Sequence, residues 1–236
     1  MKRIGFVGAY DKTDLILNLA KLIVSLEKTV LIVDSTLTQK TRYVVPALNP
    51  SNSYITNIEG IDVSVGIYSM RDIRTYLNLA EGMPLDYDFV LFDIDNPQAI
   101  NAFELLGDEL FYYFVTSMDP YSYKRGIEML QGVTTGINMT KIIFTKRYSG
   151  AEDDYLNFST LDSNMIRWND EVIYFPEGVG DELTFIDNHR TGRIRFRGIS
   201  NQYRDSLMYL TQEIVGQDVA DSITLKKIFK YLVKGA

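Results

Sequence analysis

Apolar runs alternate with amphipathic stretches along most of the chain. Seven short, nearly continuous apolar runs predict strands buried on both faces: Arg3–Gly8, Thr29–Asp34, Ile61–Gly66, Phe89–Asp93, Leu110–Thr116, Lys141–Thr145 and Val172–Phe175. Amphipathic segments between them predict helices over Thr13–Glu27, Met70–Ala80, Gln98–Leu106, Tyr121–Gly132 and Gln202–Val215. This order predicts an α/β fold with a doubly wound, mostly parallel sheet flanked by helices, which binds ligands at the carboxyl ends of its strands.

Two segments are less regular. Residues Leu37–Ile58 contain two prolines and Tyr148–Asn169 are rich in Asp and Asn, so both are predicted to be long loops. Neither reads as a domain boundary. We therefore expect a single domain over residues 1–217 and a basic amphipathic tail over 218–236.

Composition narrows the class of protein. The 236 residues are 46% hydrophobic and 23% charged, as in ordinary soluble domains, and the absence of cysteine excludes disulfides and thiolate metal sites. The chain starts directly with a predicted strand, and no apolar run approaches the ~20 residues of a membrane span, so we expect a cytoplasmic protein. The net charge of −7 argues against non-specific DNA binding by the whole chain.

A Lys-Thr pair follows the first predicted strand. Residues 4–14 read IGFVGAYDKTD, which places Lys12 and Thr13 at the end of the phosphate-binding pattern G-x-x-x-x-G-K-[ST]. That pattern needs glycines because its backbone N–H groups wrap closely around phosphates, yet its glycine positions hold Phe6 and Asp11. The Asp11 carboxylate would face the anionic phosphates.

Two later strands each end in an acid. VLIVD ends at Asp34, and FVLFD ends at Asp93 in the manner of a Walker B strand whose carboxylate orients a magnesium shell. Apolar strands that end in aspartate are common in α/β proteins, so each is weak evidence alone. The order of strand, Lys-Thr loop, helix, VLIVD and YDFVLFD is much more specific.

Taken in order, these motifs resemble those of the MinD/ParA family of deviant-Walker P-loop ATPases over nearly the full chain. The family reads KGGVGKTT, a helix with NLA, VLLVDxD and YDxVIIDxPP, where this sequence has VGAYDKTD, NLA, VLIVDST and YDFVLFDIDNP. The stretches VTSMDPYSYKRG and IYFPEGVGDELTFIDNHRTGR resemble two later parts of the family. The resemblance implies a P-loop NTPase fold that binds ATP with Mg²⁺, the latter at Thr13 and Asp93. The nucleotide site that it implies consists of Gly8, Asp11, Lys12, Thr13, Asp34 and Asp93.

The departures from the family pattern fall on catalytic positions. The acid that orients the attacking water is replaced by Thr36, and the signature lysine that reaches the partner's nucleotide is replaced by Val7. Loss of one such element commonly costs ~10²–10³ in rate, so we expect no efficient hydrolysis and assign no catalytic residue. Two interpretations stay open: ATP binding without turnover, or a Lys12 that is a helix-start cation beside an Asp11 that caps the helix.

The tail Ile223–Lys234 (ITLKKIFKYLVK) is predicted to be an amphipathic helix. Its apolar stripe and flanking cations are Leu225, Ile228, Phe229 and Leu232, with Lys226, Lys227, Lys230 and Lys234. Residues 222–236 carry +4, which leaves −11 on the rest of the chain. Lysines beside apolar residues suit an interfacial membrane helix, and the MinD branch ends in one. Packing of the stripe on the body, or on a partner protein, are the alternatives.

Other residues carry less information. His189, the only histidine, is expected to be a surface residue outside any triad. A basic stretch supports either DNA binding or contact with an acidic partner; it comprises Arg190, Arg193, Arg195, Arg197 and Arg204. The sixteen tyrosines suggest a contact surface.

The resemblance and its departures lead to one functional expectation. We expect a degenerate MinD/ParA-like protein, related to the TadZ/CpaE-like branch, that is a localisation or assembly factor for a membrane-associated pilus, secretion or conjugation machine in bacteria. It would be peripheral at the inner face of the membrane, with the machine's proteins as partners and a nucleotide-independent homodimer left open. The alternatives are an active ATP-hydrolysing partition or septum-positioning protein, and a non-catalytic interaction scaffold. We do not expect DNA as a partner.

Overall fold

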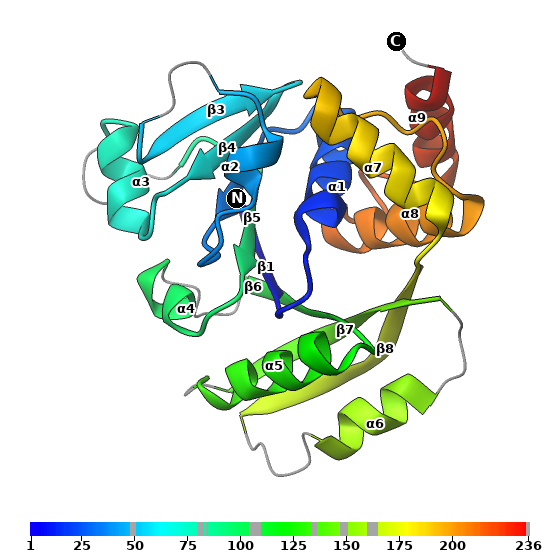
Figure 1. Ribbon diagram of the computed structural model, residues 1–236. Helices are drawn as coiled ribbons and strands as arrows, with labels where there is room; N and C mark the ends of the chain where they lie inside the picture. The colour runs from blue at the N-terminus through cyan, green and yellow to red at the C-terminus, as the bar shows by residue number, and fades with distance from the viewer. Residues whose placement is uncertain are drawn as a thin grey trace.

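The computed structural model describes residues 1–47, 51–79, 83, 85–103, 110–133, 136–146, 151–159 and 165–234. It shows one eight-stranded sheet between two layers of helices (Figure 1). The strands lie in the order β3-β4-β2-β5-β1-β6-β7-β8, and only β3 runs antiparallel to its neighbour. The predicted doubly wound, mostly parallel sheet is therefore confirmed.

The bounds of the elements follow the alternation in the sequence. The strands are Lys2–Val7 (β1), Val30–Asp34 (β2), Tyr54–Ile58 (β3), Ile61–Val65 (β4), Phe89–Ile94 (β5), Leu110–Ser117 (β6), Ile137–Thr145 (β7) and Ile166–Pro176 (β8). The helices are Thr13–Val24 (α1), Thr41–Val44 (α2), Met70–Tyr76 (α3), Gln98–Ala102 (α4), Pro120–Gln131 (α5), Ala151–Ser159 (α6), Val179–Thr191 (α7), Asn201–Val215 (α8) and Ser222–Lys234 (α9). Parts of the predicted helices near residues 80 and 104–106 lie outside the described residues.

The two predicted loops are partly regular structure. The first contains α2 and the edge strand β3, and the second contains α6 and the start of β8. Both strands lie at an edge of the sheet, where half of the residues face solvent and no continuous apolar run is needed. Helix α7 was not predicted because few of its side chains are buried.

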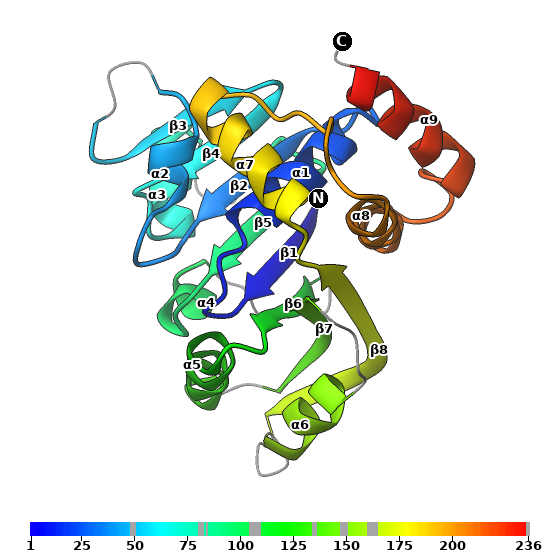
Figure 2. The ribbon, with the colours of Figure 1, turned by 45° about the vertical axis from the view of Figure 1, so that its right-hand side comes forward.

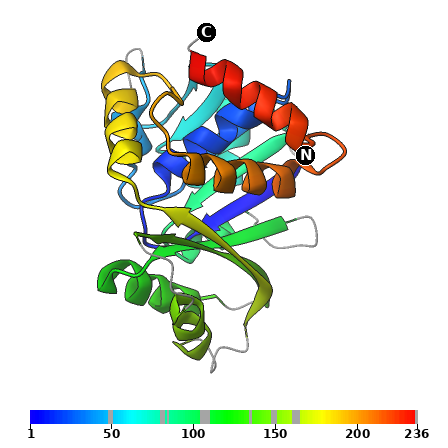
Figure 3. The same ribbon diagram turned by 90° about the vertical axis from the view of Figure 1, so that its right-hand side faces the viewer.

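Each face of the sheet carries its own core. One core lies under α1, α8 and α9, and the other lies under α3, α4, α5 and α6. Figures 2 and 3 show α8 and α9 next to each other on the first of these faces. The carboxyl ends of the strands lie between these two helical layers and are not covered by either of them.

The apolar stripe of α9 packs on the body, which is one of the three alternatives that its sequence left open. Leu225 and Phe229 are 1% and 3% exposed, and Ile228 and Leu232 pack against the same core. The Phe229 ring meets that of Phe196 edge-on at 5.0 Å. All four lysines of α9 are exposed. Within the described residues, no helix combines the length and apolar character needed to cross a bilayer.

Candidate functional site

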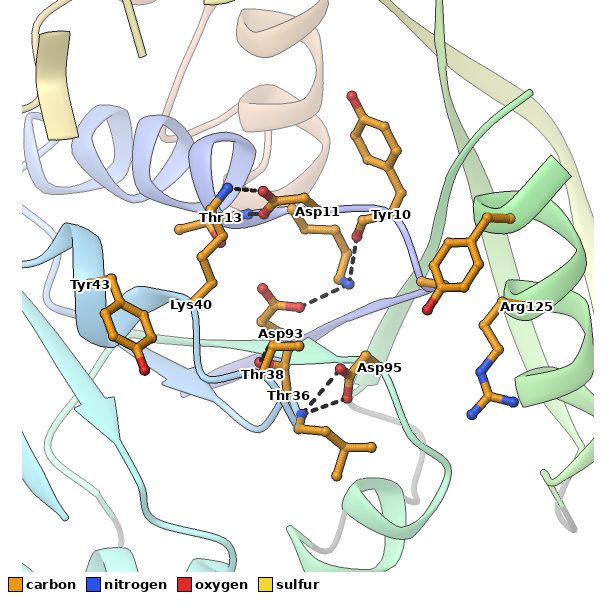
Figure 4. Close-up of a pocket in the computed structure, with 14 residues that line it drawn as sticks. Tyr10, Asp11, Thr13, Thr36, Thr38, Lys40, Tyr43, Asp93, Asp95 and Arg125 are labelled. Atoms are coloured by element: carbon orange, nitrogen blue, oxygen red, sulfur yellow. Dashed lines mark hydrogen bonds and ion pairs between the residues drawn. The ribbon is translucent and has the colours of Figure 1, made fainter. Parts of the chain in front are cut away.

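A cavity of about 520 Å³ opens at the carboxyl ends of β1, β2 and β5 (Figure 4). It is lined by Ala9, Tyr10, Asp11, Lys12, Thr13, Thr36, Leu37, Thr38, Lys40, Tyr43, Asp93, Asp95, Tyr121 and Arg125. Figure 4 shows Tyr43 and Arg125 on opposite sides, with Asp93 and Asp95 between them at the sheet edge. The sequence motifs therefore converge on the place where such folds bind ligands.

The loop after β1 is tightly packed. Phe6 lies within β1, fully buried, and its ring stacks on that of Tyr113 at 5.5 Å. Gly8 has φ 151°, and a Cβ there would lie 2.0 Å from the carbonyl oxygen of Val115. Only glycine fits this position. The strand thus extends through the first glycine position of the phosphate-binding pattern, and only residues 8–12 remain as loop.

Lys12 is held by the protein itself. Its side chain is 2% exposed, and Nζ donates hydrogen bonds to the carbonyl oxygens of Gly8 at 2.7 Å and Tyr10 at 3.1 Å. The same Nζ forms an ion pair with Asp93 Oδ1 at 2.9 Å. The ammonium group therefore makes two hydrogen bonds to the loop and one ion pair with Asp93.

Asp93 and Asp34 lie side by side at the ends of two paired strands. Burial raises the pKa of Asp93 to about 6, the Lys12 ammonium opposes that shift, and the negative charge of Asp34 adds to it. Burial disfavours the charged form of a carboxyl group, and a nearby cation favours it. Lys12 therefore keeps Asp93 ionised near neutral pH.

Asp11 occupies the N-terminal end of α1. Its Oδ1 accepts a hydrogen bond from the Thr13 backbone N–H at 3.1 Å, and its other oxygen pairs with Lys40. Asp11 was expected to cap this helix, but the helix starts at Thr13 with Lys12 at the cap position, so Asp11 lies one residue before the observed cap. Helix N-termini attract anions, and here the anion is the protein's own carboxylate.

Asp34 organises the loop between β2 and α2. It accepts hydrogen bonds from Thr36 Oγ1 at 2.6 Å and from the Thr41 backbone N–H at 3.0 Å. The buried Gln39 side chain donates to the carbonyl oxygens of Asp34 and Thr36, both at 2.7 Å, and accepts from the Gly66 N–H. Both carboxylate oxygens of the predicted site residue Asp34 therefore accept hydrogen bonds from its own loop.

A second cavity of about 750 Å³ adjoins the first along Tyr10, Asp11 and Lys40. The Tyr10 ring stacks on Phe144 at 4.6 Å, and its hydroxyl donates to Glu177 Oε1 at 2.9 Å. Tyr10 therefore ties the loop after β1 to the end of β8. Burial, followed by the charge of Glu177, raises the pKa of Tyr10, so this hydroxyl stays a hydrogen-bond donor.

The sequence matches no protein-family model and no curated protein. Three similar solved structures are the ParA family ATPase from Chlorobium tepidum TLS, a putative plasmid partition protein (BB_S35) from Borrelia burgdorferi B31 bound to AMPPNP, and the MinC:MinD cell division protein complex of Aquifex aeolicus. Their sequence identities are 14%, 13% and 13%, and their TM-scores are 0.52, 0.58 and 0.51. The matches cover 98%, 91% and 89% of this chain and 98%, 98% and 95% of those chains.

The chain has the MinD/ParA-like fold. The expected P-loop NTPase architecture is therefore confirmed. Within this fold the structure brings together five of the six predicted site residues around the first cavity or directly behind it: Asp11, Lys12, Thr13, Asp34 and Asp93. Gly8 supplies a carbonyl to Lys12 but does not line the cavity.

The donors at this site do not fit Mg²⁺ as they stand. Of the two predicted ligands, Asp93 is paired with Lys12, and Thr13 is 4% exposed. Across the described residues there is no group of three or more His, Cys, Asp or Glu side chains that could hold a metal ion. Magnesium prefers carboxylate oxygens and waters, so the Lys12 contact would have to open first.

Sequence reasoning missed three residues of the site. Tyr10 and Lys40 line both cavities, and Glu177 anchors Tyr10. Lys40 follows no recognisable motif, whereas Tyr10 lies within GAYDKT and Glu177 within the FPEG stretch. The pairing of the last two joins positions far apart in the chain, which no local pattern reveals.

His189, which was expected to be a surface residue outside any triad, is half-buried and contacts a carboxylate. Its Nε2 lies 2.7 Å from Asp14 Oδ1, so it joins α7 to the first turn of α1. The arginines of the basic stretch are mostly exposed, and two of them, Arg190 and Arg204, pair with neighbouring aspartates. These short-range pairs lower the positive charge that the stretch presents to solvent.

Proposed function

We propose that this chain is a ParA/MinD-like protein that does not hydrolyse ATP, because its phosphate loop is closed by its own side chains. The observation that carries the proposal is the engagement of the buried Lys12 ammonium by the carbonyl oxygens of Gly8 and Tyr10 and by the carboxylate of Asp93. In P-loop NTPases the lysine at this position cradles the β- and γ-phosphates. Here the same ammonium group stabilises the loop.

Two more side chains support a pseudo-ATPase. Thr36, at the position of the family's water-orienting acid, is the hydrogen-bond partner of Asp34. Val7, at the position of the signature lysine, is fully buried in β1. Phosphoryl transfer depends on positioned charges and a positioned nucleophile, and neither side chain supplies them.

The proposed role is that of a localisation or assembly factor that works through protein contacts. Large apolar and aromatic side chains surround the mouth of the first cavity, with Leu37 71%, Tyr43 80% and Tyr121 71% exposed. Aromatic residues are enriched where proteins meet. This rim supports binding of a partner protein over the closed site.

Purified protein with Mg-ATP tests the absence of turnover. Phosphate release is expected to stay at the background rate, equal to that of Lys12→Ala, because Lys12 is already held by Gly8, Tyr10 and Asp93. The measurement is a coupled phosphate-release assay together with titration calorimetry of Mg-ATP. Steady hydrolysis that Lys12→Ala abolishes would show an active ATPase and overturn the proposal.

A membrane-associated role is favoured by the outer face of α9. Its lysines are exposed together with Ile223 and Tyr231, which are 61% and 63% exposed, while the apolar stripe stays on the body. Exposed lysines near an anionic lipid surface each contribute about 1 kcal/mol of attraction. This surface would place the protein at a membrane without release of α9.

Vesicle co-sedimentation tests this second role. Vesicles with anionic lipid are expected to pellet the protein, and the triple variant Lys226→Gln, Lys227→Gln, Lys230→Gln is expected to stay in solution. Neutral vesicles and the variant Lys124→Gln on α5 serve as controls. Equal pelleting of the wild-type and triple-variant proteins would exclude a role for this face.

A further inference from the structure

The second cavity has the size of a ligand pocket but not the chemistry of a phosphate site. Its volume of about 750 Å³ falls within the range of small-molecule sites. It lies between the loop after β1, the ends of β6, β7 and β8, and the first turns of α7. Its ionisable and aromatic lining residues are therefore the features that select a ligand.

The charge of the lining is strongly negative. Six carboxylates line the cavity against two lysines and one histidine: Asp11, Asp14, Asp119, Glu177, Asp181 and Glu182, with Lys40, Lys146 and His189. Asp11 pairs with Lys40, and Asp14 pairs with His189. Within the described part of the chain, the other four carboxylates have no cationic partner. Such a cavity repels phosphates and attracts cations.

Two of these carboxylates are held in place by hydrogen bonds. Asp119 accepts hydrogen bonds from the Ser117 hydroxyl and the Tyr121 and Ser122 N–H groups, which lower its pKa to about 2. Glu177 accepts the Tyr10 hydroxyl. Both carboxylates are therefore preorganised, so a ligand does not have to order them.

Aromatic rings complete the lining. Tyr10 stacks on Phe144, and Phe185 lies tilted against Tyr203 at 5.3 Å. Ring faces attract ammonium and guanidinium groups through their quadrupoles. Carboxylates and ring faces in one cavity are the combination that recognises organic cations.

The Tyr203 hydroxyl provides an independent sign of a ligand. Tyr203 lines the cavity, is 1% exposed, and its hydroxyl has no hydrogen-bond partner in the described structure. The Asn18 amide approaches this hydroxyl, but it too lacks a bond of hydrogen-bond geometry. Buried polar groups are normally satisfied, and a phenol oxygen near Asp14 and Asp181 accepts readily from an N–H donor.

We propose that this cavity binds an organic cation through an ammonium or guanidinium group. The described carboxylates do not cluster as metal ligands, which favours an extended cation over a metal ion. The cation comes either from a free polyamine-like compound or from a lysine or arginine side chain of a partner protein. The exposed Val179 and Ile186 of α7 line the same cavity and would contact the apolar part of either ligand.

Titration calorimetry of the full chain with spermidine, agmatine and the peptide acetyl-Ala-Arg-Ala-amide tests the proposal. Saturable binding of a free cation identifies a small-molecule site, and binding of the peptide alone identifies a partner's side chain. The proposal is overturned if none of the three probes binds.

Variants separate the cavity from general surface charge. Glu182→Gln removes a lining carboxylate whose side chain makes no hydrogen bond within the described residues, and Tyr203→Phe removes the buried hydroxyl; each is expected to weaken binding ~5-fold or more. Asp187→Asn makes the same charge change on α7 outside the cavity and is expected to leave affinity unchanged. If Glu182→Gln and Asp187→Asn weaken binding equally, the cation binds through general surface charge, and the proposed site is refuted. Mg-ATP hydrolysis is a separate measurement, so either proposal can fail without the other.

Discussion

Asp11→Gly is expected to increase the affinity for Mg-ATP by ~10-fold or more. The carboxylate sits at the N-terminal end of α1, where a phosphate would bind, and a like charge at ~4 Å opposes it by ~1–4 kcal/mol at near-surface dielectric constants. Glycine also frees Lys40 from its ion pair with Asp11 and removes the side chain beside the loop backbone. Titration calorimetry with Mg-ATP and with AMPPNP measures the change.

Asp11→Asn is the matched control for this substitution. It removes the charge but keeps a side-chain oxygen for the Thr13 N–H, so it is expected to recover the electrostatic part of the gain only. Tight Mg-ATP binding by the wild-type protein, with no further gain in Asp11→Gly, would show that Asp11 does not block the site.

Lys12→Met is expected to lower the free energy of unfolding by about 3–5 kcal/mol near pH 8. The substitution leaves Asp93 buried at 5% exposure without its cation, and removal of one partner of a buried ion pair has a cost of that order. Urea unfolding measures the loss. A lysine kept free for phosphates would contribute little to stability.

The loss in Lys12→Met is expected to shrink as the pH falls. The pKa of Asp93 is already raised to about 6, above that of an unfolded aspartate, and it rises further without Lys12. The folded state then holds the proton more tightly than the unfolded state, so stability declines as pH rises from about 4 through the folded pKa. At about pH 5 the variant should therefore recover part of its stability.

Two further variants are controls for the lysine. Lys40→Met breaks an ion pair whose side chains are 41% and 46% exposed, and its expected cost is below about 1 kcal/mol. The double variant Lys12→Met, Asp93→Leu removes both charges and is expected to regain much of the loss. Wild-type stability of Lys12→Met near pH 8 would contradict a structural role for the ammonium group.

The sequence predicted the centre of the fold better than its edges. Strands β1, β2 and β5 are buried on both faces, so their apolar runs are continuous and easily recognised. The edge strand β3 and the polar start of β8 lack such runs, because solvent replaces one covering layer. The stripe of α9 was recognised, but amphipathicity alone does not say which surface a helix covers.

The sequence predicted where the residues of the candidate site lie, but not which side chains pair with one another. The order of the motifs placed Lys12, Asp34 and Asp93 at one edge of the sheet, as the structure shows. The contacts that close the site join Tyr10 to Glu177, 167 positions apart, and Asp11 to Lys40, 29 positions apart. Such pairs depend on how the loops pack against one another in the folded protein, so the spacing of residues along the chain does not predict them.

The order in which the elements are made has a consequence for folding during synthesis. Strand β1 lies between β5 and β6, and α1 contacts α8 and α9, the last helices of the chain. The ribosome extends a chain by about 5–20 residues each second, so the first elements wait many seconds for their neighbours. Their apolar surfaces stay uncovered for that time, and the nascent chain therefore needs protection from aggregation until Phe229 has left the exit tunnel.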